Sequence, residues 1–227
     1  MGIFDFLKNE KPVTVDLFGQ TVTMSKKALA YSQLGIGKYN AQDYVGVVEV
    51  FGQSISLMPR SASLYVWRGT SYEDYGKYDE AKTDFQTALK LEPDDFLAAY
   101  RLGMIYSDRG DRAEAAHWLN ESYENARFEV PHMLHLGWSK NCLFFVGKQI
   151  ISHNLGIQYL ESRMSEAAIP YFEHAARIEP GYANAYFGLG AANYNIGRKE
   201  NAFKHFSEAA KLGHSKASSL ISSLDWE

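Results

Sequence analysis

The side chains of this sequence best suited to bind a metal ion are histidines and a single cysteine that fall close together. His132, His135 and Cys142 form an H-x2-H-x6-C string, and His153 follows it. Zinc sites usually carry paired Cys or His ligands at both ends, as in CxxC or HExxH motifs, and neither motif occurs here. We therefore expect no metal site, and we interpret these histidines as solvent-facing or hydrogen-bonded side chains.

Motifs for nucleophilic or phosphate chemistry are also absent from the sequence. There is no GxSxG elbow, no Cys-His pair in a matching context and no glycine-rich loop between a strand and a helix. The sequence indicates a protein that recognises a partner, without catalysis and without a cofactor.

Composition limits which classes of partner and which cellular compartment we expect for this protein. The 227 residues have a formal net charge of −4, which gives no general signal for nucleic-acid or membrane binding. The one cysteine excludes an intramolecular disulfide, and the first residues lack the apolar core of a signal peptide. No stretch reaches the roughly 18 apolar residues of a membrane span. We expect a cytoplasmic protein.

The elements that must position a binding surface come from a repeat with a period of 34 residues. Each repeat shows apolar and small residues at three- and four-residue steps in two successive stretches, which predicts two amphipathic helices. Such units cannot bury their apolar faces alone and therefore stack on one another. The five repeats span residues 28–61, 62–95, 96–129, 149–182 and 183–216.

A glycine recurs inside the first helix of every repeat, where it would normally cost about 1 kcal/mol of helix stability. We expect it to allow a close approach to a small residue of the second helix, with a larger side chain filling the space beside them. These glycines are Gly35, Gly69, Gly103, Gly156 and Gly190. Gly76, Gly110 and Gly197 are predicted to lie in turns between helices, and Pro170 to delay or kink the second helix of 149–182.

These residues resemble the tetratricopeptide repeat (TPR) family. Its pattern of an aromatic, Gly, Tyr, Ala, Phe, Ala and Pro is met by Tyr65, Gly69, Tyr72, Ala81, Phe85, Ala88 and Pro93. Arg68 departs from it, because the family has Leu there. The resemblance implies an all-α fold, a right-handed superhelical solenoid of about five helix pairs occupying residues 28–227.

Three segments lie outside the repeats. Within the N-terminal tail and cap, 1–27, alternating residues around Phe18-Gly19-Gln20 predict a β-hairpin that covers the first repeat. Residues 217–227 are predicted to form a capping helix, because a terminal repeat otherwise exposes its apolar face. The apolar insertion 130–148 is interpreted either as a buried structural element or as an interaction element.

In the TPR family the first helix of each pair lines a concave groove. Carried over by position, the resemblance implies a peptide-binding groove formed by Tyr39, Asn40, Trp67, Asp74, Tyr100, Arg101, Asp108, Asn154, Glu161, Phe187, Tyr194 and Asn195. The thirteenth position of every repeat is Asn, Asp or Glu, and aromatic residues recur beside it. Trp67 is expected to be a central anchor for the ligand.

We therefore expect a scaffold or adaptor that binds a protein or peptide partner. The carboxylates of the groove favour a ligand that carries Lys or Arg together with an apolar anchor. The alternative is a self-assembling structural protein, a homo-oligomer that uses the 130–148 insertion or the caps as its interface.

Overall fold

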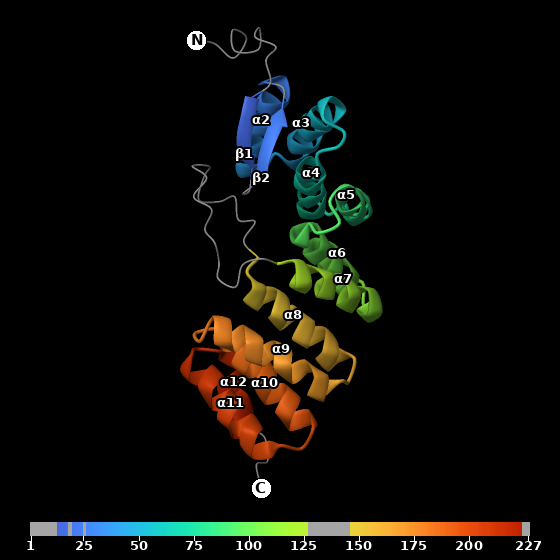
Figure 1. The fold of residues 1–227 in the computed structure, drawn as a ribbon. Coiled ribbons are helices and arrows are strands. Elements are labelled where there is room, and N and C mark those ends of the chain that lie inside the picture. Colours follow the sequence, from blue (N-terminus) through green and yellow to red (C-terminus); the bar gives the residue numbers. More distant parts are fainter. Residues whose placement is uncertain (1–12, 18–19, 25, 127–145, 224–227) are drawn as a thin grey trace. The chain divides into compact units, whose positions relative to one another are not determined.

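The computed structural model describes residues 13–17, 20–24, 26–126 and 146–223. The chain divides into two compact units, with the boundary between Leu102 and Gly103. Unit 1 contains the described residues up to Leu102, and unit 2 contains the described residues from Gly103 onward. Figure 1 shows the order of the elements along the chain.

Unit 1 begins with a two-stranded antiparallel sheet, in which Val13 of β1 pairs with Met24 of β2 and Leu17 pairs with Gln20. Two helix pairs follow, and α3 of the first packs against α4 of the second. Its elements are β1 (Val13–Leu17), β2 (Gln20–Met24), α2 (Lys26–Asn40), α3 (Tyr44–Leu57), α4 (Ala62–Asp74) and α5 (Tyr78–Leu91). The strands lie in the segment predicted to form a hairpin, and the role of this hairpin as a cap stays a prediction.

Helix α6 (Phe96–Asp108) contains the boundary between the units. The other helices of unit 2 are α7 (Arg112–Asn125), α8 (Lys148–Glu161), α9 (Ser165–Ile178), α10 (Ala183–Asn195), α11 (Lys199–Lys211) and α12 (Ser215–Ser223). Two helices thus fall in each 34-residue repeat, as predicted. Helix α12 packs against α11 and buries Ala217. The whole of 127–145, with most of the insertion and with His132, His135 and Cys142, lies outside the described residues.

The turn inside each helix pair uses a left-handed residue at the fifteenth repeat position. Gly76, Gly110 and Gly197 have φ values of 76°, 76° and 78° there, which confirms their predicted place in turns. The other two repeats carry Gln42 and Arg163 at this position, each with φ of 60°. Because a side chain is crowded in this conformation, these two turns are strained and the glycine turns are not.

The repeated glycines lie against the large residue of the partner helix, in place of the small residue expected from the sequence. A Cβ added to Gly35, Gly69, Gly156 or Gly190 would meet a phenylalanine ring within 2.6–2.8 Å. At Gly103 the same atom would meet Leu119 Cγ at 2.9 Å and the Leu119 backbone nitrogen at 3.2 Å. Close approach of the helices is confirmed, and these large residues set the limit of that approach.

The ring of Phe172 in α9 lies between two glycines of different helices. Gly156 of α8 is close on one side, and a Cβ on Gly188 of α10 would lie 2.5 Å from Phe172 Cδ1. Phe172 is fully buried and packs with Ala168 and Leu189. In unit 1 the equivalent ring, Phe51 of α3, stacks on Trp67 of the next repeat with 5.7 Å between ring centroids.

Pro170 does not delay its helix, contrary to one of the two outcomes predicted for it. Helix α9 begins at Ser165 and continues without interruption through Pro170 to Ile178. The proline is exposed and follows the first turn closely. It therefore removes one backbone hydrogen bond at the solvent side, where the helix tolerates that loss.

Candidate functional site

The C-terminal ends of the first helices present a short polar side chain in every repeat. Asp74, Asp108, Glu161 and Asn195 are exposed there, and Asn40 is half-buried. All five are carboxylates or carboxamides and can accept hydrogen bonds. Unit 1 holds Asn40 and Asp74, and unit 2 holds the other three.

In unit 1, Tyr39 connects α2 to α4 at this end of the helices. Its hydroxyl donates a hydrogen bond of 2.5 Å to Asp74 Oδ2, and its ring meets the edge of Tyr44 at 5.8 Å. Burial, followed by this hydrogen bond to Asp74, raises the pKa of Tyr39 well above its ordinary value. Tyr39 therefore stays protonated at neutral pH and fixes the position of the Asp74 carboxylate.

Trp67 is a core residue, and the prediction that its ring anchors a ligand is wrong. Only 5% of the residue is exposed. Its ring stacks on Phe51 with an interplanar angle of 9° and meets the edge of Tyr39 at 6.1 Å. Trp67, at the sixth position of its repeat, faces the preceding repeat because the ring of Phe51 there offers a flat surface on which the indole stacks.

Arg101 of α6 pairs with a carboxylate of α4. Its Nη1 lies 3.4 Å from Glu73 Oε2, and both side chains are about one-fifth exposed. Tyr100, its neighbour in sequence, is half-buried. The pair holds the start of α6 to the end of α4 within unit 1 and partly neutralises the charge next to Asp74.

In unit 2, polar side chains join α6 to α8 beneath the predicted groove. Asn154 Nδ2 lies 3.4 Å from Met104 Sδ, and Gln158 Nε2 donates a hydrogen bond of 2.7 Å to Ser107 Oγ. Glu161 lies 3.7 Å from Arg112 with both side chains about half exposed, so this ion pair is weak. The Asp108 carboxylate is exposed at the end of α6.

The aromatic residues of α10 differ in their exposure. Phe187 is half-buried, and its ring stacks on His214 with 4.1 Å between centroids. Tyr194 is 36% exposed, and Asn195 Nδ2 donates a hydrogen bond of 3.1 Å to Ser165 Oγ. The sequence did not indicate His214 as a neighbour, because it stands where the family pattern has proline.

The remaining histidine of the metal-like string, His153, packs among aromatic rings. Its ring meets Phe172 at 5.7 Å and Tyr182 at 5.3 Å, and Nδ1 lies 3.3 Å from Asn154 Oδ1. Burial lowers the pKa of His153 below its ordinary value. Within the described ranges, no group of three or more His, Cys, Asp or Glu side chains is arranged to hold a metal ion.

Comparison with known families agrees with this architecture. The family described as "Tetratricopeptide repeat" matches residues 68–129 and 153–217, which is more than half of the chain. The chain belongs to the tetratricopeptide repeat family. Among the helices that the structure describes, none is long and apolar enough to cross a membrane.

Curated relatives cover most of this TPR chain but are much longer than it. It is 30% identical over 200 residues to Superkiller protein 3 of Schizosaccharomyces pombe, covering 86% of this chain and 14% of that protein. It is 21% identical over 217 residues to BBSome complex member BBS4 of Bos taurus, covering 87% of this chain and 41% of that protein. The chain thus spans less than half the length of these relatives.

Solved TPR structures share its fold over nearly their whole length. MamA matches with a TM-score of 0.67 and 20% identity, over 85% of this chain and 95% of MamA. YrrB, described as a TPR protein with an unusual peptide-binding site, matches with a TM-score of 0.67 and 17% identity, over 87% of this chain and 92% of YrrB. At these identities the likeness establishes the fold alone.

Proposed function

We propose that this TPR chain is a scaffold or adaptor that binds a peptide segment of a partner protein on its first-helix surface. In unit 1 this surface comprises Tyr39, Asn40, Asp74, Tyr100 and Arg101, and in unit 2 it comprises Asp108, Asn154, Glu161, Phe187, Tyr194 and Asn195, so each unit carries its own part. The observation that carries the proposal is the polar residue at the thirteenth position of every repeat, exposed in four of the five.

A carboxylate or carboxamide at the same place in successive repeats of each unit suits a ligand with regularly spaced donors. An extended peptide has such donors, because its backbone N–H groups recur along the chain. Three of the five acceptors are acidic, which favours Lys or Arg side chains on the peptide. Proteins of this family mediate protein–protein interactions, and the peptide-binding site named for YrrB supports the same general role.

Tyr194 takes the place of Trp67 as the aromatic contact in this proposal. Its side chain is 36% exposed at the end of α10, next to the thirteenth-position Asn195. Phe187 of the same helix is half-buried and adds a smaller apolar area. An aromatic ring beside a hydrogen-bonding side chain is a frequent composition of peptide-binding surfaces.

The proposal is tested by panning a random peptide library on the full chain and measuring the selected peptides by biolayer interferometry. The variant D74N/D108N removes two charges, and the carboxamide oxygen that it introduces at position 74 can still accept the hydrogen bond from Tyr39. We expect the selected peptides to carry Lys or Arg and to associate more slowly with this variant than with the unmodified chain. The difference between the two association rates should become smaller at high salt, because salt screens the charges. The matched control is E121Q/E173Q, which removes two exposed charges from second helices.

Two results would contradict the proposal. One is equal association rates for the unmodified chain and D74N/D108N. The other is binding that survives both D74N/D108N and Y194A but is lost when 130–148 is deleted, because that places the interface at the insertion and supports self-assembly or a different contact.

A further inference from the structure

Two neighbouring turns of unit 1 expose large apolar side chains. Val45, at the start of α3, is 59% exposed. Tyr75 and Tyr78, on either side of the α4–α5 turn, are 49% and 46% exposed. Tyr39 shows that the two turns are adjacent, because its ring contacts Tyr44 beside Val45 and its hydroxyl binds Asp74 beside Tyr75.

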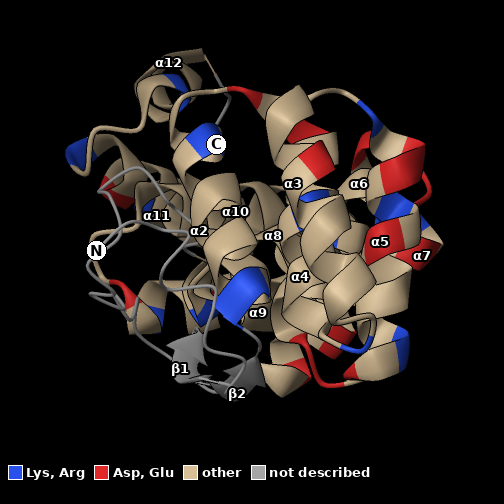
Figure 2. Cartoon of the chain, turned by 90° about the horizontal axis from the view of Figure 1, so that it is seen from above, with Lys and Arg blue, Asp and Glu red and all other residues tan. Residues whose placement is uncertain are grey.

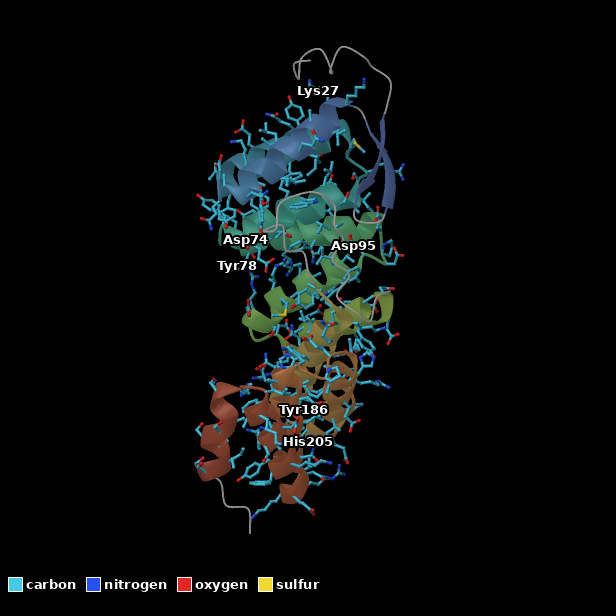
Figure 3. The ribbon with its side chains drawn as sticks, turned by 90° about the vertical axis from the view of Figure 1, so that its left-hand side faces the viewer. Lys27, Asp74, Tyr78, Asp95, Tyr186 and His205 are labelled. Atoms are coloured by element: carbon cyan, nitrogen blue, oxygen red, sulfur yellow. The ribbon has the colours of Figure 1, made fainter. Side chains whose placement is uncertain are left out.

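Acidic residues flank these tyrosines along the chain. Asp74, Asp79 and Glu80 are all exposed, within seven residues of chain. Figure 2 shows acidic residues in red on α5, and Figure 3 shows Asp74 and Tyr78 at the same edge of unit 1. Lys77 is the one basic residue between Asp74 and Glu80. The turn therefore combines exposed aromatic area with a negative charge.

The same turn in the next repeat has the opposite character. The positions of Tyr75 and Tyr78 are there occupied by Arg109 and Arg112, both exposed. Acidic residues in the first turn of α5 are explained by the helix dipole, which favours Asp79 and Glu80 at an N-terminus. The dipole does not explain two half-exposed tyrosines, and the turn geometry set by Gly76 needs no aromatic residue at either position.

We propose that Val45, Tyr75, Tyr78, Asp79 and Glu80, the turn patch, form a second contact surface whose occupant is a cationic peptide segment. An Arg or Lys side chain can lie over an exposed tyrosine ring, where the negative face of the ring attracts the cation. A guanidinium in that place also hydrogen-bonds a carboxylate in a bidentate manner. Val45 adds apolar area for an aliphatic side chain of the same segment.

The turn patch and the first-helix surface have no residue in common, so variants of one leave the other unchanged and the two proposals can fail separately. The test uses a fluorescein-labelled decapeptide of alternating Arg and Leu, titrated with the full chain and followed by fluorescence anisotropy. The variants are Y75S/Y78S, which removes the rings, and D79N/E80Q, which removes the charges. The matched control E200Q/F203S removes an exposed acid and an exposed aromatic from α11 of unit 2.

We expect each patch variant to bind the peptide at least about fivefold more weakly, because cation–ring and carboxylate contacts at exposed sites contribute modestly. E200Q/F203S should bind within about twofold of the unmodified chain, and a peptide with Glu in place of Arg should not bind. The variants have exposed substitutions only, and circular dichroism melting verifies that they fold.

The turn-patch proposal is overturned if the unmodified chain does not bind the Arg-Leu peptide. It is also overturned if both patch variants bind as well as the unmodified chain, or if the control weakens binding as much as they do. D74N/D108N is measured in parallel. A loss in that variant with no loss in the patch variants would support the first-helix surface alone.

Discussion

Replacing Gly188 with Ala tests how tightly Phe172 is held in the core of unit 2. The new Cβ would lie 2.5 Å from Phe172 Cδ1 and 2.6 Å from Cζ, closer than carbon atoms can approach. The ring cannot retreat, because Gly156 on its other side leaves room for no more than a hydrogen atom, with a built Cβ 2.8 Å from the ring. Either α9 and α10 must separate or Phe172 must leave its rotamer.

Overpacking of this kind costs about 1–3 kcal/mol, and the absence of free space on either side of the ring places this case at the upper end. The matched control is Gly37→Ala in α2, because Gly37 is also inside a helix and has nothing within 4 Å of its built Cβ. There alanine should stabilise the chain by about 0.5–1 kcal/mol through its higher helix propensity. The same substitution is thus expected to have opposite signs at the two sites.

Urea unfolding followed by circular dichroism measures both changes as shifts of the transition midpoint. The double variant G188A/F172L should recover part of the loss, because leucine removes the ring atoms that clash. Equal, small stabilisation by Ala at Gly188 and Gly37 would refute the close packing of Phe172 between α8 and α10.

Backbone strain, burial and protonation each give a further testable expectation. Arg163→Gly should stabilise the chain by about 0.5–1 kcal/mol, because glycine adopts the left-handed backbone at φ 60° without strain. Gly110→Ala, in the equivalent turn, should destabilise the chain for the same reason. Urea unfolding should therefore give a higher midpoint for Arg163→Gly than for the unmodified chain, and a lower one for Gly110→Ala. Trp67→Ala should cost about 3–5 kcal/mol of unfolding free energy, as expected of a buried ring, and a loss of peptide binding with unchanged stability would contradict it. His153 has a pKa below its ordinary 6.5, so the unfolded chain binds the proton first and stability falls as pH drops through 6.5 toward the lower folded-state value. Thermal melts at pH 7.5 and 5.5 should show a smaller difference in H153Q than in the unmodified chain.

The positions of the helices could be predicted from the sequence because the same spacing of glycine, small and large residues occurs in all five repeats. Gly35 and Gly103 differ in their neighbours along the chain, yet each stands twelve residues before a small or compact residue, Val47 or Ala115, and this shared spacing identified both as contact positions. The left-handed turns at Gln42 and Arg163 were not predicted, because neither residue type suggests positive φ. Their alignment with Gly76 was the signal that could have found them.

Which surface residues are available for binding could be predicted only in part. Trp67 and Arg101 both occupy the sixth repeat position, but one is buried against Phe51 and the other pairs with Glu73. The outcome depends on the side chain that the preceding repeat presents, and a pattern within one repeat does not contain that information. The bond from Tyr39 to Asp74 is also of this kind, since it joins residues 35 positions apart.

The packing of Phe172 also limits how this array could be shortened, extended or recombined. Of the five repeats, the last alone has glycine at its sixth position; the others have Gln33, Trp67, Arg101 and Asn154 there. With Phe172 in its present place, a successor of repeat 149–182 needs glycine at its sixth position; any other residue would require the ring to repack, as Phe51 stacks on the sixth-position Trp67 in unit 1. We therefore expect the packing of Phe172 to survive the transfer of these two repeats as a pair and to be lost when they are separated.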